Sequence, residues 1–283
     1  MKGPRALSPD RVRPGPLSVG FAAVMCLATS LTLAGGLEPP LDLVIRYPES
    51  GSGLLRYAFV RHDTVVAAMP SGEEQTQVFG RTSYLTLTWI ASDSGTRITA
   101  AIDSVVPEEG VSRFDPVVDS ALGARWTAWR QPNGALTRLD AGPRSSVAEQ
   151  VRDQLRLLFP ILPPQGASPG QSWGDSTAGP ALVSAFVAQE RVKLTSLAEP
   201  GPDGSLAITV VRERAADGEG LQYLQPITIT ATGTDSLSYA MTGDGIVHDV
   251  TGRRLTHLDL DLPAIGQRVS ARVRSHLAMR LLP

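Results

Sequence analysis

Cysteine, asparagine and aromatic residues are all scarce in this sequence of 283 residues. The single cysteine is Cys26, so the rest of the chain can form neither a disulfide nor a thiolate metal site. The single asparagine, Asn133, precedes Gly134 and therefore lies in no N-glycosylation sequon. Aromatic residues make up only 5% of the chain, so a core must rely on Val, Leu, Ile and Ala. An exported protein without disulfides or sequons fits a bacterial envelope better than a eukaryotic secretory route.

An excess of charge of one sign is also missing. The formal net charge is −2 at pH 7, and the arginines are scattered along the chain. Removal of residues 1–36 takes away four basic residues and one acidic residue, which leaves a net charge of about −5. We therefore expect no binding to nucleic acid.

The first 36 residues have the pattern of a secretory signal peptide. A basic start precedes an uncharged stretch, Leu17–Gly36, that ends in small residues suited to cleavage before Leu37. The alternative is an uncleaved inner-membrane anchor, because the stretch is about long enough to span a bilayer. We expect an exported protein, periplasmic or extracellular, that contacts the membrane only if this segment is retained.

From residue 37 onward, apolar and polar residues alternate with a period of two, which predicts antiparallel strands. The exception is a helix predicted over 145–159, which ends before Pro160 and carries its apolar residues on one stripe. The predicted fold is mainly β (α+β): a large curved antiparallel sheet or incomplete barrel with this helix on its concave face. We expect one domain, 37–283, whose β-rich halves, 37–140 and 170–283, are joined by the helix and a Pro/Gly-rich connector.

Two hairpins have a predicted register. A loop over 263–266 places Leu258 opposite Ala271 and Asp261 opposite Arg268, so that apolar residues meet on one face. Asn133-Gly134, a strong hairpin signal, predicts a two-residue loop that places Trp129 opposite Arg138.

Few residues indicate chemistry. Gly170 to Gly174 matches the G-x-S-x-G pattern with Ser172 as nucleophile, but irregular Pro/Gly-rich sequence precedes it and no helical pattern follows. The competing interpretation is a connector in which Trp173 covers the edge of the core. No metal-ligand spacing, Walker loop or dinucleotide fingerprint is present, so we expect no metal, no cofactor and no enzyme activity.

The exported β-rich pattern with a helix between two halves resembles, in architecture, the half-barrel of lipoprotein carrier proteins. The run from Leu155 to Asp175 is also similar to a segment of uncharacterised exported bacterial proteins. The first resemblance implies a curved sheet that wraps helices and holds acyl chains.

Three functions follow as hypotheses. The first is a non-catalytic envelope protein that binds a lipid or a lipoprotein acyl chain between sheet and helix, because one short helix cannot cover all the apolar strand faces. The second is a structural or protein-binding envelope module without a ligand cavity, and the third is a hydrolase that uses Ser172. Residues expected to contact an apolar ligand are Trp89, Trp126, Val151, Leu155, Leu158 and Phe159. Arg274 and Arg280, which lack an evident acidic partner, are the candidates for an anionic contact.

Overall fold

The computed structural model describes residues 43–68, 72–92, 95–108, 121–140, 146–183, 186–222, 225–263 and 266–283. All of them belong to one unit, Pro40–Pro283. The predicted signal segment, residues 1–36, lies outside the described residues.

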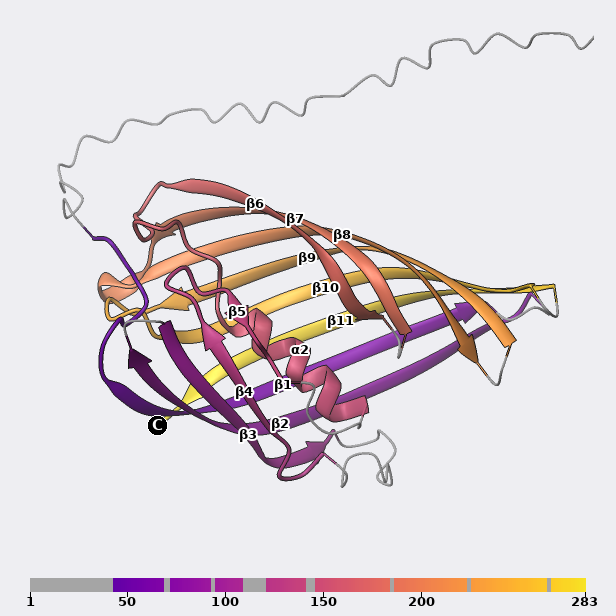
Figure 1. Ribbon diagram of the computed structural model, residues 1–283, viewed down its shortest axis with the longest axis horizontal. Coiled ribbons are helices and arrows are strands. Elements are labelled where there is room, and N and C mark those ends of the chain that lie inside the picture. Colours follow the sequence, from indigo (N-terminus) through magenta and orange to yellow (C-terminus); the bar gives the residue numbers. More distant parts are fainter. Residues whose placement is uncertain are drawn as a thin grey trace, which may run out of the picture. The chain divides into compact units, whose positions relative to one another are not determined.

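In the described ranges, eleven antiparallel strands form one sheet, and one α-helix lies between its fifth and sixth strands in the sequence (Figure 1). The inward side chains of each strand alternate with outward ones, as the period-2 pattern predicts; in β8, for example, Leu206, Ile208 and Val210 are all buried. The elements are β1 (Ser52–Ala68), β2 (Glu74–Ser92), β3 (Gly95–Pro107), β4 (Arg125–Arg130), β5 (Leu136–Thr137), α2 (Ser146–Leu158), β6 (Ser172–Val183), β7 (Phe186–Pro200), β8 (Leu206–Gln222), β9 (Gln225–Met241), β10 (Val247–Leu262) and β11 (Gln267–Leu282), with a 3-10 turn at Pro202–Gly204.

The strand order is β5-β4-β3-β2-β1-β11-β10-β9-β8-β7-β6. The chain thus starts in the middle of the sheet, runs outward to β5, and returns through α2 to the opposite edge at β6. Among the described residues β5 and β6 have no strand on their outer sides, so the sheet is not closed. It curves around α2 (Figure 1), which confirms the predicted fold class of an open, curved antiparallel sheet with one helix.

The main core lies where α2 packs on the concave face. Helix residues Val151, Leu155 and Leu158 are buried there with strand residues such as Tyr57 and Leu87. Burial of each such side chain contributes about 1.5–3 kcal/mol. The helical stripe predicted from the sequence therefore faces the sheet, as expected.

The two predicted hairpins have different outcomes. In β10–β11 the register is confirmed, with Leu258 opposite Ala271 and Asp261 opposite Arg268. In β4–β5 the predicted register is wrong by one residue, because Trp129 lies opposite Thr137 and not opposite Arg138. The Gln131 N–H donates to the Ala135 carbonyl, and Gly134 has a φ of +92°, so the loop has three residues with a left-handed glycine at its end.

Candidate functional site

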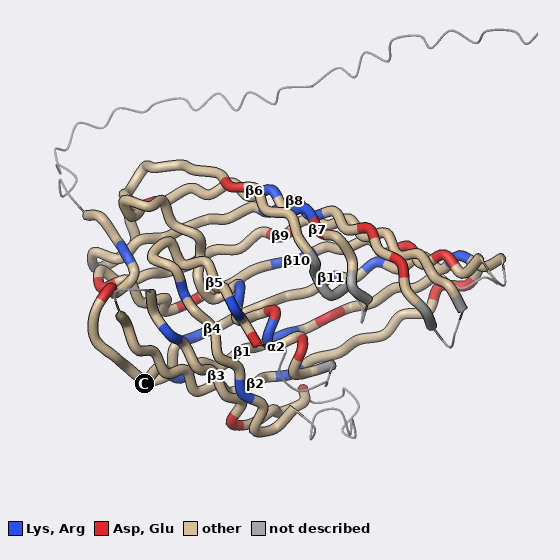
Figure 2. The backbone as a smooth tube through the Cα atoms, in the orientation of Figure 1, with Lys and Arg blue, Asp and Glu red and all other residues tan. Residues whose placement is uncertain are grey.

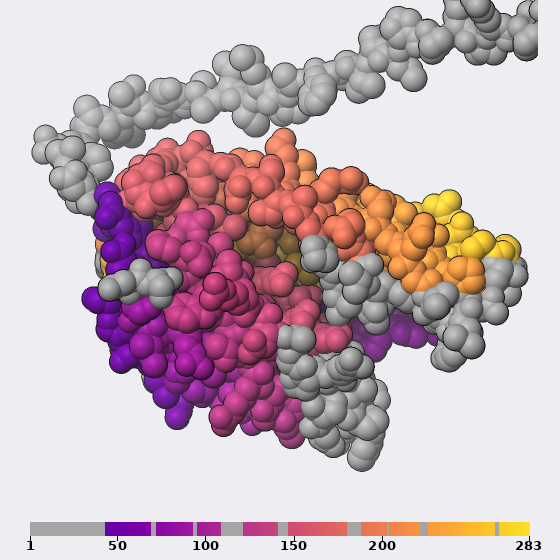
Figure 3. Space-filling view, in the orientation of Figure 1, coloured from indigo at the N-terminus to yellow at the C-terminus, as the bar shows by residue number. Residues whose placement is uncertain are grey.

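Two adjoining cavities of about 410 and 640 Å³ lie between α2 and the concave face of the sheet. Figure 3 shows a hollow between the segment around α2 and strands β6–β8. The lining residues that the two cavities share come from one helix face and from strands β7, β8 and β10: Glu149, Asp153, Leu157, Glu190, Arg214 and Arg254. The space between sheet and helix is therefore open in part and lined by charged side chains.

On the sheet side, polar residues lie in register across five strands. Arg212 of β8 is opposite Asp235 of β9, which is opposite Arg254 of β10. The row continues through Ser275 of β11 to Asp63 of β1. Because residues directly opposite each other share a face, this polar row crosses the concave face. Figure 2 shows charged residues both on α2 and on the strands beside it.

Asp235 is the most buried carboxylate of this row. Its side chain is 2% exposed, and Arg254 holds it with two hydrogen bonds, from Nε to Oδ1 at 2.9 Å and from Nη2 to Oδ2 at 3.1 Å. Arg214 approaches the same carboxylate at 3.9 Å and donates through Nε to Glu190 at 2.7 Å. Burial lowers the pKa of Arg254, as does the neighbouring charge of Arg214, while Asp235 favours the charged form. The arrangement pairs two arginines with two carboxylates inside the fold.

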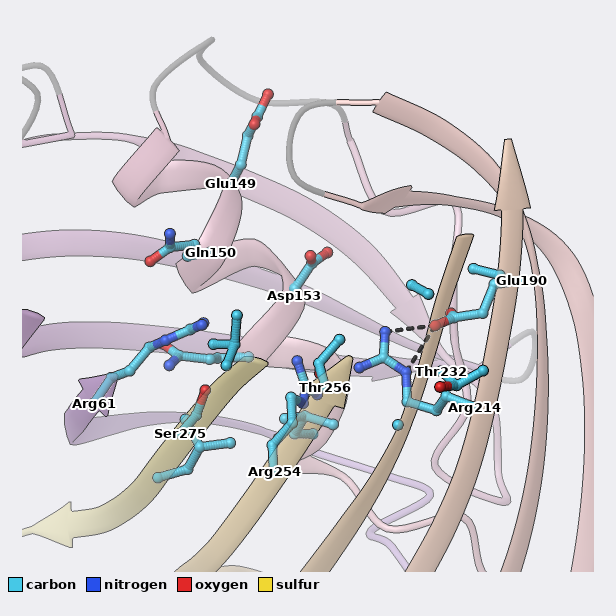
Figure 4. A pocket seen from close by; sticks show the side chains of 17 residues that line it. Arg61, Glu149, Gln150, Asp153, Glu190, Arg214, Thr232, Arg254, Thr256 and Ser275 are labelled. Atoms are coloured by element: carbon cyan, nitrogen blue, oxygen red, sulfur yellow. Dashed lines mark hydrogen bonds and ion pairs between the residues drawn. The ribbon is translucent and has the colours of Figure 1, made fainter. Parts of the chain in front are cut away.

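The helix presents its polar face to the same space. Glu149, Asp153 and Arg156 follow one another at helical spacing, and all three line the larger cavity. Figure 4 shows Asp153 pointing from α2 into the space that Arg214 and Glu190 face from the sheet. Burial raises the pKa of the Asp153 carboxyl above its ordinary value, although the nearby arginines lower it. The polar face of α2 therefore lines the partly open space between helix and sheet.

Several buried polar atoms on the concave face have no hydrogen-bond partner among the described residues: Asp63 Oδ1, Ser196 Oγ, Arg212 Nε, Tyr239 Oη and Ser275 Oγ. Three of these five atoms belong to the polar row itself. Native proteins leave few buried polar atoms unpaired, and each such atom calls for an explanation. Two of the five residues, Arg212 and Ser275, also line one of the two cavities, so these unpaired atoms belong to side chains at a candidate binding space.

An apolar strip lies on the same face, on the side of the polar row away from the main core. We call it the alanine trough: the buried residues Ala188, Ala216, Ile229, Ala231 and Leu258, with Leu260 and Ala271 packed against them. These residues belong to strands β7–β11 and include none from α2. From Asp235 to Ile229 along β9 the distance is about 20 Å, at 3.4 Å per residue. The face thus joins a charged row to a narrow apolar strip lined by small side chains.

The apolar residues predicted to bind a ligand lie mainly in the core. Trp126, Val151, Leu155 and Leu158 are buried there, and Trp89 packs against them. Phe159 is the one member of the predicted set that lines either of the two cavities described above. Ligand contact by these residues stays a prediction. The charged lining was not predicted. The sequence does contain a signal for it, because charged residues replace apolar ones at inward positions of strands β8–β10: Arg212, Arg214, Asp235 and Arg254.

The predicted anionic contacts lie on the other face of the sheet. Arg280 has an acidic partner, because its Nε donates to Asp249 at 3.0 Å, so the expectation that it lacks one is wrong. An anionic contact by Arg280 stays a prediction. Arg274 is exposed on the convex face and forms no ion pair with any described residue. Neither arginine lines the two cavities between α2 and the sheet.

The structural context of Ser172 differs from that of a hydrolase nucleophile. Ser172 is exposed at the start of edge strand β6, and a strand follows it where the motif requires a helix. Trp173 packs against the core edge, and its Nε1 donates to the Ile161 carbonyl at 2.8 Å. The segment therefore has the geometry of the connector that was the competing interpretation.

The described residues hold neither a cluster of metal ligands nor a membrane-spanning helix. They contain no group of three or more His, Cys, Asp or Glu side chains placed to hold a metal ion. Nor does any helix in the described ranges have the length and apolar character needed to cross a bilayer.

Comparisons with known proteins assign no family. No family model matches the chain, and no curated protein matches it. Among solved structures, a mutant porin from Rh. blastica aligns with 82% of this chain and 100% of its own, at 12% sequence identity and a TM-score of 0.24. A score at this level does not indicate a shared fold, so what can be said of function depends on the residues of this chain.

Proposed function

We propose that the protein is an exported, non-catalytic carrier that binds an amphiphile, a lipid or a lipoprotein acyl chain, between α2 and the concave face of the sheet. The observation that supports this most is the cavity of about 410 Å³, because Ala216 and Ala231 of the alanine trough line it together with charged residues. An apolar strip that ends at a row of charges matches a molecule with an apolar tail and a polar head.

The size of the lining side chains supports the same proposal. Ala216 and Ala231 line the cavity of about 410 Å³ with small side chains, and Ala188 and Ala271 belong to the same apolar cluster without lining either cavity. Protein interiors are normally packed without voids larger than a water molecule. A concave face that keeps small residues beside an open cavity is suited to a long, flexible apolar ligand.

Filling the trough tests this proposal. Ala231→Phe places a large side chain inside it, whereas Thr230→Phe, one residue earlier on β9, places the same side chain on the exposed outer face. We expect Ala231→Phe to weaken binding of a fluorescent acyl-chain probe by at least about 10-fold, because the probe and the ring compete for the same volume. Thr230→Phe should bind the probe as the wild type does.

Native mass spectrometry of the purified protein gives a second measurement. The proposal predicts co-purified lipid, lost in Ala231→Phe and retained in Thr230→Phe. Absence of both co-purified lipid and probe binding in the wild type would refute the carrier proposal and favour a structural or protein-binding module. Export is checked separately, because the intact mass of the mature protein should equal that of a chain that begins at Leu37.

A further inference from the structure

Arg212 is an inward-facing arginine that pairs with no carboxylate of the described residues. It lines the larger cavity, its Nε is buried without a hydrogen-bond partner, and among the described residues it forms no ion pair. Asp235 lies directly opposite it on β9, but both oxygens of that carboxylate accept hydrogen bonds from Arg254. Arg212 thus combines a side chain that lines the larger cavity with a buried N–H that has no acceptor among the described residues.

The charges around the larger cavity do not balance. Its lining holds five arginines and four carboxylates. Arg254 pairs with Asp235 and Arg214 with Glu190, while Arg152 lies 4.0 Å from Asp153. The remaining charged residues are Arg212 on the sheet and Arg156 and Glu149 on the helix, and Figure 4 shows Glu149 directed away from Arg214 and Glu190. The part of the cavity near Arg212 thus has a surplus of positive charge.

Arg212 also lies at a fixed distance from the apolar trough. Ala216 is four residues further along β8 on the same face, which corresponds to about 13 Å. A ligand whose tail lies along the trough would place its polar end at the row that contains Arg212. An arginine is suited to this position because its planar guanidinium binds carboxylate or phosphate oxygens with paired hydrogen bonds.

We infer that this site is specific for an anionic head group, a carboxylate or a phosphate carried on an acyl chain, and that Arg212 binds it, with Arg156 of α2 contributing from the opposite wall. The inference rests on the proposed carrier function and adds the charge class of the ligand. It also explains why a buried guanidinium Nε is kept without a partner in the protein itself, since an unpaired buried donor destabilises the fold.

The test compares ligands that differ only in their heads. Hexadecanoate, hexadecyl phosphate and hexadecanol share one tail, and their dissociation constants are measured on the full, delipidated chain by displacement of an uncharged fluorescent acyl probe. Wild-type protein should bind both anions more tightly than the alcohol, by on the order of 10- to 100-fold, the worth of one or two charge-assisted hydrogen bonds.

Two arginine variants separate binding from general charge effects. Arg212→Met should abolish the preference for the anions and leave the affinity for hexadecanol unchanged. Arg274→Met removes the same charge from the exposed convex face and should keep the preference. The unfolding midpoint of ligand-free Arg212→Met should equal or exceed that of the wild type, because the variant removes a buried donor that has no acceptor.

Three results would overturn the inference. The first is that the wild type binds hexadecanol and the two anions with equal affinity. The second is that Arg212→Met loses the same affinity for all three ligands. The third is that inorganic phosphate alone displaces the probe at the concentration at which hexadecyl phosphate does. Failure of all three ligands to bind would remove the carrier function as well, whereas equal binding removes only the anionic head group.

Discussion

Replacement of Asp235 by asparagine is the most direct test of how the charged interior is held together. The side chain keeps its shape but loses its charge, and the amide nitrogen cannot accept a hydrogen bond. Asp235 is 2% exposed and receives both Arg254 bonds, so the variant leaves a largely buried guanidinium without its counter-charge. Removing one partner of a buried ion pair costs about 3–5 kcal/mol.

The lower end of that range applies here. Arg254 keeps 17% of its side-chain surface exposed, and Arg214 still has Glu190 as a partner. We therefore expect Asp235→Asn to lower the free energy of unfolding by about 3 kcal/mol. At about 2–4 °C per kcal/mol for a domain of this size, the melting temperature should fall by about 6–12 °C.

Urea denaturation followed by circular dichroism measures the loss, with Asp261→Asn as the matched control because Asp261 is exposed on the convex side of β10. The control should stay within about 0.5 kcal/mol of the wild type. The double variant Asp235→Leu with Arg254→Leu should recover at least half of the loss, since neither member of this ion pair is left without the other. A loss below about 1 kcal/mol in Asp235→Asn, or a double variant less stable than the single one, would contradict the reasoning.

Two further predictions concern the helix and a turn. Asp153→Asn should raise the free energy of unfolding at neutral pH and leave it unchanged in strong acid. The folded-state pKa of Asp153 is raised, so the stability of the wild type is not reduced below the ordinary Asp pKa, where the carboxyl is protonated in both states. That stability is lost as the pH rises through the folded-state pKa and the buried carboxyl ionises. Because this side chain is 41% exposed, the gain should be about 1 kcal/mol or less, and melting curves recorded from pH 3 to pH 7, where the two proteins should diverge with rising pH, check it. Gly245→Ala should cost at least about 2 kcal/mol, because Gly245 has a φ of +78° and an added Cβ would lie 1.9 Å from the Arg46 carbonyl oxygen. Gly204→Ala, with a φ of +74° and open space around it, should cost only about 1 kcal/mol in the same urea titration, and equal losses in the two variants would refute the clash.

The architecture could be predicted from the sequence where local pattern and tertiary packing agree. The β10–β11 register follows from apolar residues such as Leu258 and Ala271 that must share one face, and a shift by one residue would place them in water. The register predicted for β4–β5 is wrong by one residue because Asn133-Gly134 is compatible with two loop lengths, and Pro132 before it favours the longer loop.

The cavity lining could not be predicted in the same way, because it depends on alignment between strands. Arg212, Asp235 and Arg254 meet only because the registers of β8, β9 and β10 place them in one row. Each of them, taken alone in its strand, is simply a charged residue at an inward position. The alternation within each strand is enough to identify them as charges among inward, mostly apolar positions, but it does not reveal which of them pair with each other.

The strand pair β1–β11 joins the two ends of the described chain at the middle of the sheet. During synthesis β1 is made long before β11, its neighbour on one side. Until β11 is made, one edge of β1 has unpaired backbone N–H and C=O groups. Such distant pairing makes folding slow and exposes the edge to association with other chains meanwhile. The central seam of the sheet is therefore the last part of the sheet that can form, and loss of β11 would leave both β1 and β10 with an open edge.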